Sequence, residues 1–224
     1  MALGAFRYTT AMQPILIVQR GLESYDHTYR AMREFTQSRD VSSPDQLWLV
    51  THPPIFTLGL GADPGNILDA HHIPVVQTDR GGEVTFHGPG QAIVYLLIDL
   101  RRRHIDGKLL PREFVHLIEQ AIIDTLAAYN LVGQRKAGAP GIYLASGPYS
   151  GAKIAALGLK VRVNGCTYHG LSLNVAMDLT PFSWIHPCGY EDLVTVDMQS
   201  LGVDVDVETV QAALANNLIH QLKG

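Results

Sequence analysis

The sequence predicts a mixed β-sheet with helices packed against it, the α/β or α+β class, in a single domain spanning residues 1–224. Three observations carry this prediction. Strand-like and helix-like segments alternate along the chain, and no repeat or Ser/Gly-rich linker divides them. Residues 92–98 form an apolar run with β-branched members, as expected of a buried central strand. Asn164-Gly165 is a strong hairpin signal, which excludes a purely parallel sheet.

Each element has a local signal. Apolar and β-branched runs bounded by turn residues predict strands at 15–18, 47–51, 75–78, 92–98, 141–144, 154–163 and 167–175. Apolar residues at helical spacing predict helices at about 22–38, from Pro111 to Tyr129, and at about 207–222 with Asp206 as its N-cap. The Pro- and Gly-rich stretch 52–65 is predicted to be a loop.

Composition limits the possible classes of protein. A hydrophobic fraction of 46% in 224 residues predicts a folded core. The net charge of -4 argues against a nucleic-acid binder, and the longest apolar run is too short to cross a bilayer. Two cysteines give no disulfide framework. We therefore expect a soluble protein of the reducing cytoplasm that binds neither nucleic acid nor membrane.

One basic cluster interrupts this acidic chain, at Arg101-Arg102-Arg103-His104. A short run of like charges is most often a solvated loop. It can also be a docking patch for an acidic partner. The sequence alone leaves both interpretations open.

Residues 151–189 hold the candidate chemistry. Lys153 stands among Ala and Ile, a poor setting for a hydrated ammonium, and Cys188 lies on a Pro-Cys-Gly turn that can present a thiol to a ligand. We hypothesise that Lys153 and Cys188 meet in space as an acyl-transfer pair. The alternatives are a lysine whose stem packs while its amine reaches water, and a buried structural cysteine, the role expected of Cys166.

Other site types have weaker support. Residues 147–153 read G-x-x-x-G-x-K, which lacks the spacing of a phosphate loop, and Gly59-x-Gly61 lacks the third glycine of a dinucleotide fingerprint. No metal-binding spacing organises His169, His186 and the two cysteines, so no metal is expected. A cysteine hydrolase with a histidine at 87, 169 or 186 as its base stays open on composition alone.

Four blocks resemble one family. They are RGGEVTFHGPGQ (80–91), GAKIAALG (151–158), YHGLSLNV (168–175) and PCG (187–189), preceded by HPPIFTLG (52–59). In this order they resemble the lipoyl(octanoyl) transferases. The resemblance implies the fold of the biotin/lipoate protein ligases, a mixed sheet flanked by helices.

The resemblance also implies an activity and its partners. Members of this family move an octanoyl group from octanoyl-acyl carrier protein to a lysine of lipoyl domains, without a cofactor. Those domains belong to the 2-oxoacid dehydrogenase complexes and to the glycine cleavage H protein. Cys188 would carry the acyl group as a thioester, and Lys153 would work beside it.

The same resemblance implies an acyl pocket. Its residues would be Arg80, Gly81, Gly82, Glu83, Val84, Thr85, Phe86, His87, Ala156, Leu157, Gly158, Gly170, Leu171 and Ser172. Two positions depart from the family pattern, since many relatives carry Ser at the place of Ala156 and Tyr at that of Phe86. Each change removes a hydroxyl group but leaves an apolar wall.

Three alternatives accompany this expectation. The first is an ATP-dependent lipoate–protein ligase, or an amidotransferase between lipoyl domains, of the same fold. The second is a non-catalytic protein that binds acyl chains or lipoyl domains, in which Cys188 only packs. The third, a cysteine hydrolase, would release free octanoate.

Overall fold

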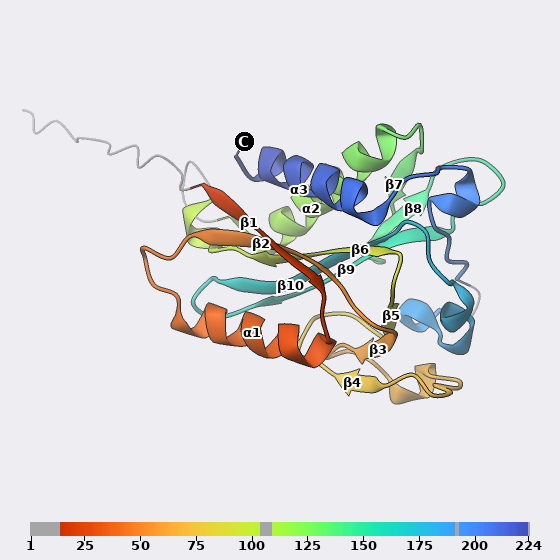
Figure 1. Cartoon of the computed structure of the whole chain (residues 1–224), viewed down its shortest axis with the longest axis horizontal. Coiled ribbons are helices and arrows are strands. Elements are labelled where there is room, and N and C mark those ends of the chain that lie inside the picture. Colours follow the sequence, from red (N-terminus) through yellow and green to blue (C-terminus); the bar gives the residue numbers. More distant parts are fainter. Residues whose placement is uncertain (1–13, 104–108, 191–192, 224) are drawn as a thin grey trace, which may run out of the picture.

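A computed structural model describes residues 14–103, 109–190 and 193–223 of the chain. Two β-sheets and three α-helices make up these residues, together with short 3₁₀ turns (Figure 1). The predicted class, a mixed sheet flanked by helices, is confirmed.

The larger sheet has seven strands in the order β1-β2-β6-β10-β9-β8-β7. Their bounds are β1 Ile15–Leu22, β2 Asp45–Thr51, β6 Gln91–Leu97, β7 Gly133–Arg135, β8 Ile142–Leu144, β9 Lys153–Val161 and β10 Thr167–Asn174. Only the β1–β2 pair in this sheet is parallel. Every residue of β6 is buried, as the apolar run predicts for a central strand covered on both faces.

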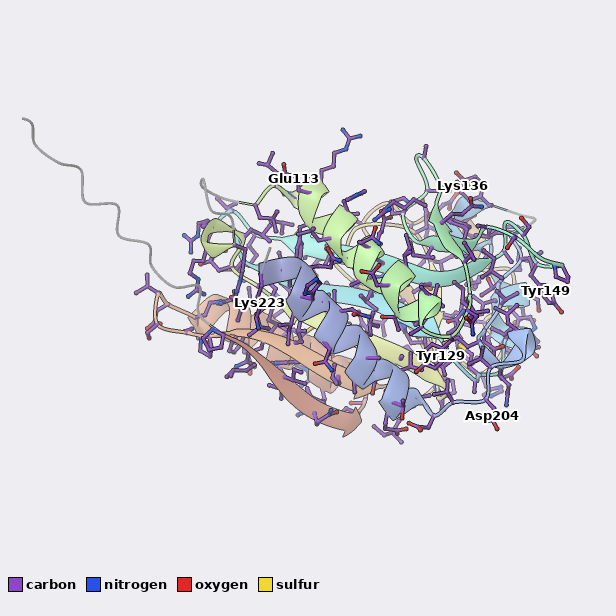
Figure 2. The ribbon with its side chains drawn as sticks, turned by 90° about the horizontal axis from the view of Figure 1, so that it is seen from above. Glu113, Tyr129, Lys136, Tyr149, Asp204 and Lys223 are labelled. Atoms are coloured by element: carbon purple, nitrogen blue, oxygen red, sulfur yellow. The ribbon has the colours of Figure 1, made fainter. Side chains whose placement is uncertain are left out.

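Helices cover both faces of this sheet. Figure 1 shows α1 (Tyr25–Ser38) on one side and α2 (Pro111–Ala127) with α3 (Val207–Lys223) on the other. Figure 2, seen from above, shows α2 and α3 side by side, with Glu113 near the start of α2. Strand β6 alternates between the two layers. Val94 packs with α2 and α3, whereas Tyr95 packs in the cluster that includes Met32 of α1.

The second sheet corrects one prediction. The stretch 52–65, expected to be a loop, contains β3 (Ile55–Leu58), which pairs with β4 (Val75–Gln77) and β5 (Thr85–His87). All four residues of β3 are buried, so the strand has no polar alternation to reveal it. Its partners lie 20 to 30 residues further along, roughly, and the Pro and Gly residues at its ends hide it in a local pattern. Strands β5 and β7 were also not predicted.

The predicted hairpin joins β9 to β10. The Gly165 amide donates to the carbonyl of Arg162 (2.9 Å), and Gly165 has φ +78°. This is a tight turn that ends in a left-handed residue, a position that suits glycine. Cys166 follows it and is buried. At the final helix, the Thr209 amide donates to Asp206 Oδ1 (2.6 Å), which confirms the predicted N-cap.

The arginines of the basic cluster form ion pairs with the buried residues Asp45 and Asp99. Arg103 is buried and donates through Nε to Asp45 Oδ2 (2.6 Å). Arg102 reaches Asp45 at 3.3 Å, and Arg101 donates to Asp99 Oδ2 (2.7 Å). Arg39 also pairs with Asp45. Each of the three arginines in the cluster therefore has an acidic partner, and the side chains range from the buried Arg103 to the largely exposed Arg101. His104 lies outside the described residues.

Across the part of the chain that the structure describes, no helix combines the length and apolar character needed to cross a bilayer.

Candidate active site

A cavity of about 560 Å³ lies among strands β5, β6, β9 and β10 and the loop that leads into β5. Every predicted pocket residue except Phe86 lies on its wall, and so does Lys153. The loop supplies Arg80 to Val84, and β9 and β10 supply the Ala156–Gly158 and Gly170–Ser172 segments. The structure thus brings the loop block together with the two hairpin blocks, which lie much further along the chain.

Phe86 points elsewhere. Its ring packs 5.5 Å from that of Phe56 and 5.7 Å from that of Phe182, in a separate apolar cluster. Strand alternation explains the difference, because neighbouring residues of β5 point to opposite faces. Thr85 and His87 face the cavity, and Phe86 between them faces the core of the small sheet.

Small residues on facing strands make room for the cavity. Ala156 lies opposite Ser172, and Gly158 lies opposite Gly170. A Cβ added at Gly158 would lie 2.8 Å from the carbonyl oxygen of Gly81. The glycine is therefore required where the loop approaches the strand. There the Gly81 amide donates to the carbonyl of Leu159 (2.9 Å), which docks the loop on β9.

Arg80 anchors this loop from inside. The side chain is 8% exposed, and its Nη2 donates to the carbonyl oxygen of Thr57 (2.6 Å) and to Thr57 Oγ1 (3.0 Å). The guanidinium thus ties the loop to β3 while its stem lines the cavity. This position gives Arg80 a structural part to play in addition to any contact with a ligand.

Lys153 begins β9 and is 5% exposed. Its Nζ donates to the carbonyl oxygen of Pro140 (3.0 Å) and lies 5.4 Å from the centre of the Tyr143 ring. Gly141 makes room for it, because a Cβ there would lie 2.7 Å from Lys153 Cε. The alternative of a strand lysine whose amine reaches bulk water does not fit this position.

Cys188 lies on the 3₁₀ turn Pro187–Gly189, where Gly189 has φ +72° and its amide donates to the carbonyl of His186 (3.0 Å). Pro187 and Tyr190, on either side of the turn, line the same cavity as Lys153. The side chain of Cys188 lies outside the described part of the structure. Its pairing with Lys153 therefore stays a prediction.

Two polar residues that the sequence analysis did not assign, Gln91 and Asn174, complete the wall beside His87. The His87 Nδ1–H donates to Gln91 Oε1 (2.8 Å), and the Gln91 amide donates to Asn174 Oδ1 (2.9 Å). Burial, with the nearby His52 imidazole, lowers the pKa of His87 to about 3, so the ring is neutral near pH 7. Gln91 is the last residue of the RGGEVTFHGPGQ block, and Asn174 lies in the YHGLSLNV block. These blocks were therefore the sequence signal from which both residues could have been assigned to the site.

A second polar group surrounds Asp79. It accepts hydrogen bonds from His169 Nε2 (3.0 Å), Tyr29 Oη (2.9 Å) and Tyr168 Oη. Burial alone would raise the pKa of Asp79, but these hydrogen bonds hold it well below its usual range. His169 has φ +59°, uncommon outside glycine, and lines the cavity. Among the described residues, no group of three or more His, Cys, Asp or Glu side chains could hold a metal ion.

Comparisons with known proteins identify the family. Residues 24–219 match the Lipoyl protein ligase A/B catalytic domain. The chain is 68% identical over 209 residues to the octanoyltransferase of Herminiimonas arsenicoxydans, covering 93% of this chain and 97% of the relative. It is 66% identical to that of Janthinobacterium sp. (strain Marseille), covering 92% and 95%. This chain belongs to the octanoyltransferase family. It is therefore an acyltransferase.

Solved structures agree on the fold of this octanoyltransferase family member. It matches a bipartite lipoate protein ligase from the archaeon Thermoplasma acidophilum with a TM-score of 0.73 at 15% identity, covering 94% of this chain and 84% of that one. A lipoate-protein ligase A bound with ATP gives 0.70, also at 15% identity, covering 94% and 85%. At such identities the likeness establishes the lipoate-ligase fold alone.

Proposed function

We propose that this octanoyltransferase moves an octanoyl group from octanoyl-acyl carrier protein to a lysine of a lipoyl domain, through a thioester on Cys188. The observation that carries the proposal is the buried Lys153 amine on the wall of a cavity that the Pro187–Gly189 turn also borders. A relative that is 68% identical to this chain is named an octanoyltransferase, which supports octanoyl as the acyl group.

The first half-reaction loads the enzyme. The Cys188 thiolate attacks the thioester carbonyl of the donor, and the bond from that carbonyl to the phosphopantetheine sulfur breaks. The Lys153 ammonium gives a proton to the departing thiolate, which leaves as a thiol. An ammonium close to a cysteine favours its thiolate, because opposite charges stabilise each other most strongly where water is scarce.

The second half-reaction unloads the enzyme. The lysine amine of the lipoyl domain attacks the Cys188 thioester, the carbon–sulfur bond breaks, and an amide forms. Neutral Lys153 takes the proton that the attacking amine loses, which returns the enzyme to its starting state. Since a thioester is already activated, the cycle needs no ATP and no cofactor.

The cavity suits a straight acyl chain. Ala156, Leu157 and Val84 give it apolar or small walls, and the Gly81-Gly82 backbone borders it. Each methylene buried there contributes roughly 0.8 kcal/mol to binding. In this proposal residues 1–224 act as one catalytic unit in the cytoplasm, and the acceptors are lipoyl domains of 2-oxoacid dehydrogenase complexes and the glycine cleavage H protein.

Mass spectrometry of the intact protein tests the proposal. The wild-type chain is mixed with octanoyl-acyl carrier protein in the absence of ATP, and the adduct is mapped to a peptide. We expect an octanoyl group on Cys188 that hydroxylamine removes and that disappears when a lipoyl domain is added. Cys188→Ala should abolish the adduct, and Cys166→Ala should leave it unchanged.

Other outcomes would favour other functions. No adduct without ATP, followed by modification of the lipoyl domain once ATP and the free acid are supplied, would indicate a ligase. Release of free octanoate without any acceptor would indicate a hydrolase. An adduct that maps only to Cys166 would exclude the proposed intermediate.

A further inference from the structure

A buried carboxylate lies behind the peptide that holds Lys153. Glu119, in the middle of α2, is 8% exposed and stands on a helix whose neighbours Ile118 and Ile122 belong to the apolar core. Its Oε2 accepts from Arg135 Nε (3.1 Å), and its Oε1 accepts from the amide of Gly141 (3.3 Å). A buried charge is costly, so an ion pair and a backbone hydrogen bond together make this position tenable.

The amide that Glu119 binds and the carbonyl that Lys153 binds belong to the same peptide. Lys153 Nζ donates to the oxygen of Pro140, and Glu119 accepts from the next nitrogen, that of Gly141. No cis peptide occurs among the described residues, so this C=O and N–H point in opposite directions. One rigid plane thus stands between the carboxylate and the ammonium.

We propose that Glu119 is a positioning residue for Lys153, acting through the Pro140–Gly141 peptide. A carboxylate on the N–H side fixes the plane of the peptide and polarises it, which makes the Pro140 oxygen a better acceptor for the ammonium. Only glycine suits position 141 of this peptide, because the backbone there has φ +127° and has no room for a Cβ. The inference rests on the proposed role of Lys153 as the proton carrier.

A purely structural role for Glu119 makes different predictions. If the carboxylate only pairs with Arg135 to fasten β7 to α2, its loss should lower stability and leave Lys153 unaffected. The chain offers a matched control on the same helix. Glu113 also accepts a backbone amide, that of Leu110 (3.0 Å), but it lies at the exposed N-terminus of α2 (Figure 2).

The experiment compares Glu119→Gln, Glu119→Leu and Glu113→Gln in the full chain. The first readout is the rate at which acetic anhydride labels Lys153, mapped by peptide and normalised to Lys160 and Lys136. We expect Glu119→Gln to speed this labelling about threefold or more, because a neutral acceptor holds the peptide less strongly than a charged one. Glu119→Leu should speed it further, and Glu113→Gln should match the wild type.

The second readout separates kcat from KM in octanoyl transfer. We expect Glu119→Gln to lower kcat roughly threefold to tenfold and to leave the KM for the donor unchanged. This is the effect expected when a hydrogen bond to a charged acceptor becomes one to a neutral acceptor. Wild-type labelling of Lys153 and wild-type kcat in a folded Glu119→Gln protein would overturn the inference. So would an equal effect of Glu113→Gln.

The labelling readout keeps this inference separate from the proposed function. It reports how Lys153 is held, and it needs neither a donor nor an acceptor. If the wild type forms no thioester and Glu119→Gln still speeds labelling, the proposed cycle fails and the positioning by Glu119 stands. If the wild type forms the thioester and labelling does not change, the reverse conclusion follows.

Discussion

The side chain of Lys153 lies where a side chain at position 141 would have to lie. A Cβ at Gly141 would lie 2.7 Å from Lys153 Cε and 3.1 Å from Nζ, and the Gly141 backbone has φ +127°. The lysine side chain, together with the carbonyl oxygen of Ala155 at 2.6 Å, therefore fills the place that any other residue at 141 would need. This relationship makes the backbone at 141 as important to the position of the amine as the lysine itself.

We expect Gly141→Ala to lower both stability and activity. The positive φ should cost about 1–3 kcal/mol of unfolding free energy. The displaced amine should lower kcat on the order of 100-fold, the usual effect of a misplaced group in a catalytic site. Urea unfolding and steady-state transfer measure the two effects. Gly147→Ala is the control, because Gly147 also has a positive φ (+85°) but nothing lies near its added Cβ. An equal loss of kcat in both variants would contradict the assignment.

We expect Ala156→Leu to change the preference for acyl length. Ala156 lies on the cavity wall, and the larger side chain adds three carbon atoms to the space that a long chain would fill. Transfer of octanoyl should fall more than transfer of butyryl, by a factor that grows with each excluded methylene at roughly 0.8 kcal/mol. Competition between the two acyl donors measures the ratio of octanoyl transfer to butyryl transfer. A ratio equal to that of the wild type would place the acyl chain elsewhere.

We expect stability to fall as the pH drops below about 6.5, the pKa of an unfolded histidine. The folded-state pKa of His87 is about 3, lowered chiefly by burial, and burial also lowers the pKa values of His52 and His169. Below pH 6.5 the unfolded chain binds more protons than the folded one, so protonation favours unfolding. His87 alone should contribute a loss on the order of 1 kcal/mol per pH unit down to its folded pKa.

Urea titrations between pH 4.5 and 7.5, roughly the range in which histidine charge changes, measure this slope. His87→Gln should make the slope shallower. His27→Gln is the control, because His27 is exposed on α1. If His87→Gln retains the wild-type slope, another group causes the acid sensitivity.

Much of the fold followed from local patterns. The β6 run, the hairpin at Asn164-Gly165 and the cap at Asp206 each depend on residues within one element, so the sequence displays them directly. Strand β3 does not, because its four buried residues become a strand only when β4 and β5 supply hydrogen bonds. The site shows the same division. The motif blocks located most of the cavity wall, but Phe86 faces away because of β5 alternation, and no pattern pointed to Gly141 or Glu119.

The basic cluster at residues 101–103 gives a further prediction. Asp45 is buried and faces Arg39, Arg102 and Arg103. Asp45→Asn should lower the unfolding free energy by about 3–5 kcal/mol, because it leaves buried guanidinium groups without a counter-charge. Arg101→Gln should cost less than about 1 kcal/mol, since Arg101 is largely exposed.

The same variants test the docking interpretation of this cluster. At a temperature where both proteins are folded, we expect each to keep the wild-type KM for octanoyl-acyl carrier protein. A selective rise in KM for the carrier-bound donor, with a small thioester unaffected, would show instead that the cluster contacts the carrier.

Strand β9 begins with Lys153 and continues without a break through Ala156 and Gly158. The amine and the β9 part of the cavity wall are thus covalently linked by an extended backbone, which β10 pairs from Ala155 to Val161. No hinge or loop separates Lys153 from Ala156 and Gly158, so this strand fixes the spacing between the amine and its own part of the wall. Along β9, a change in the space for the acyl chain therefore requires a change in the volume of individual side chains, because sliding this strand would move the lysine as well.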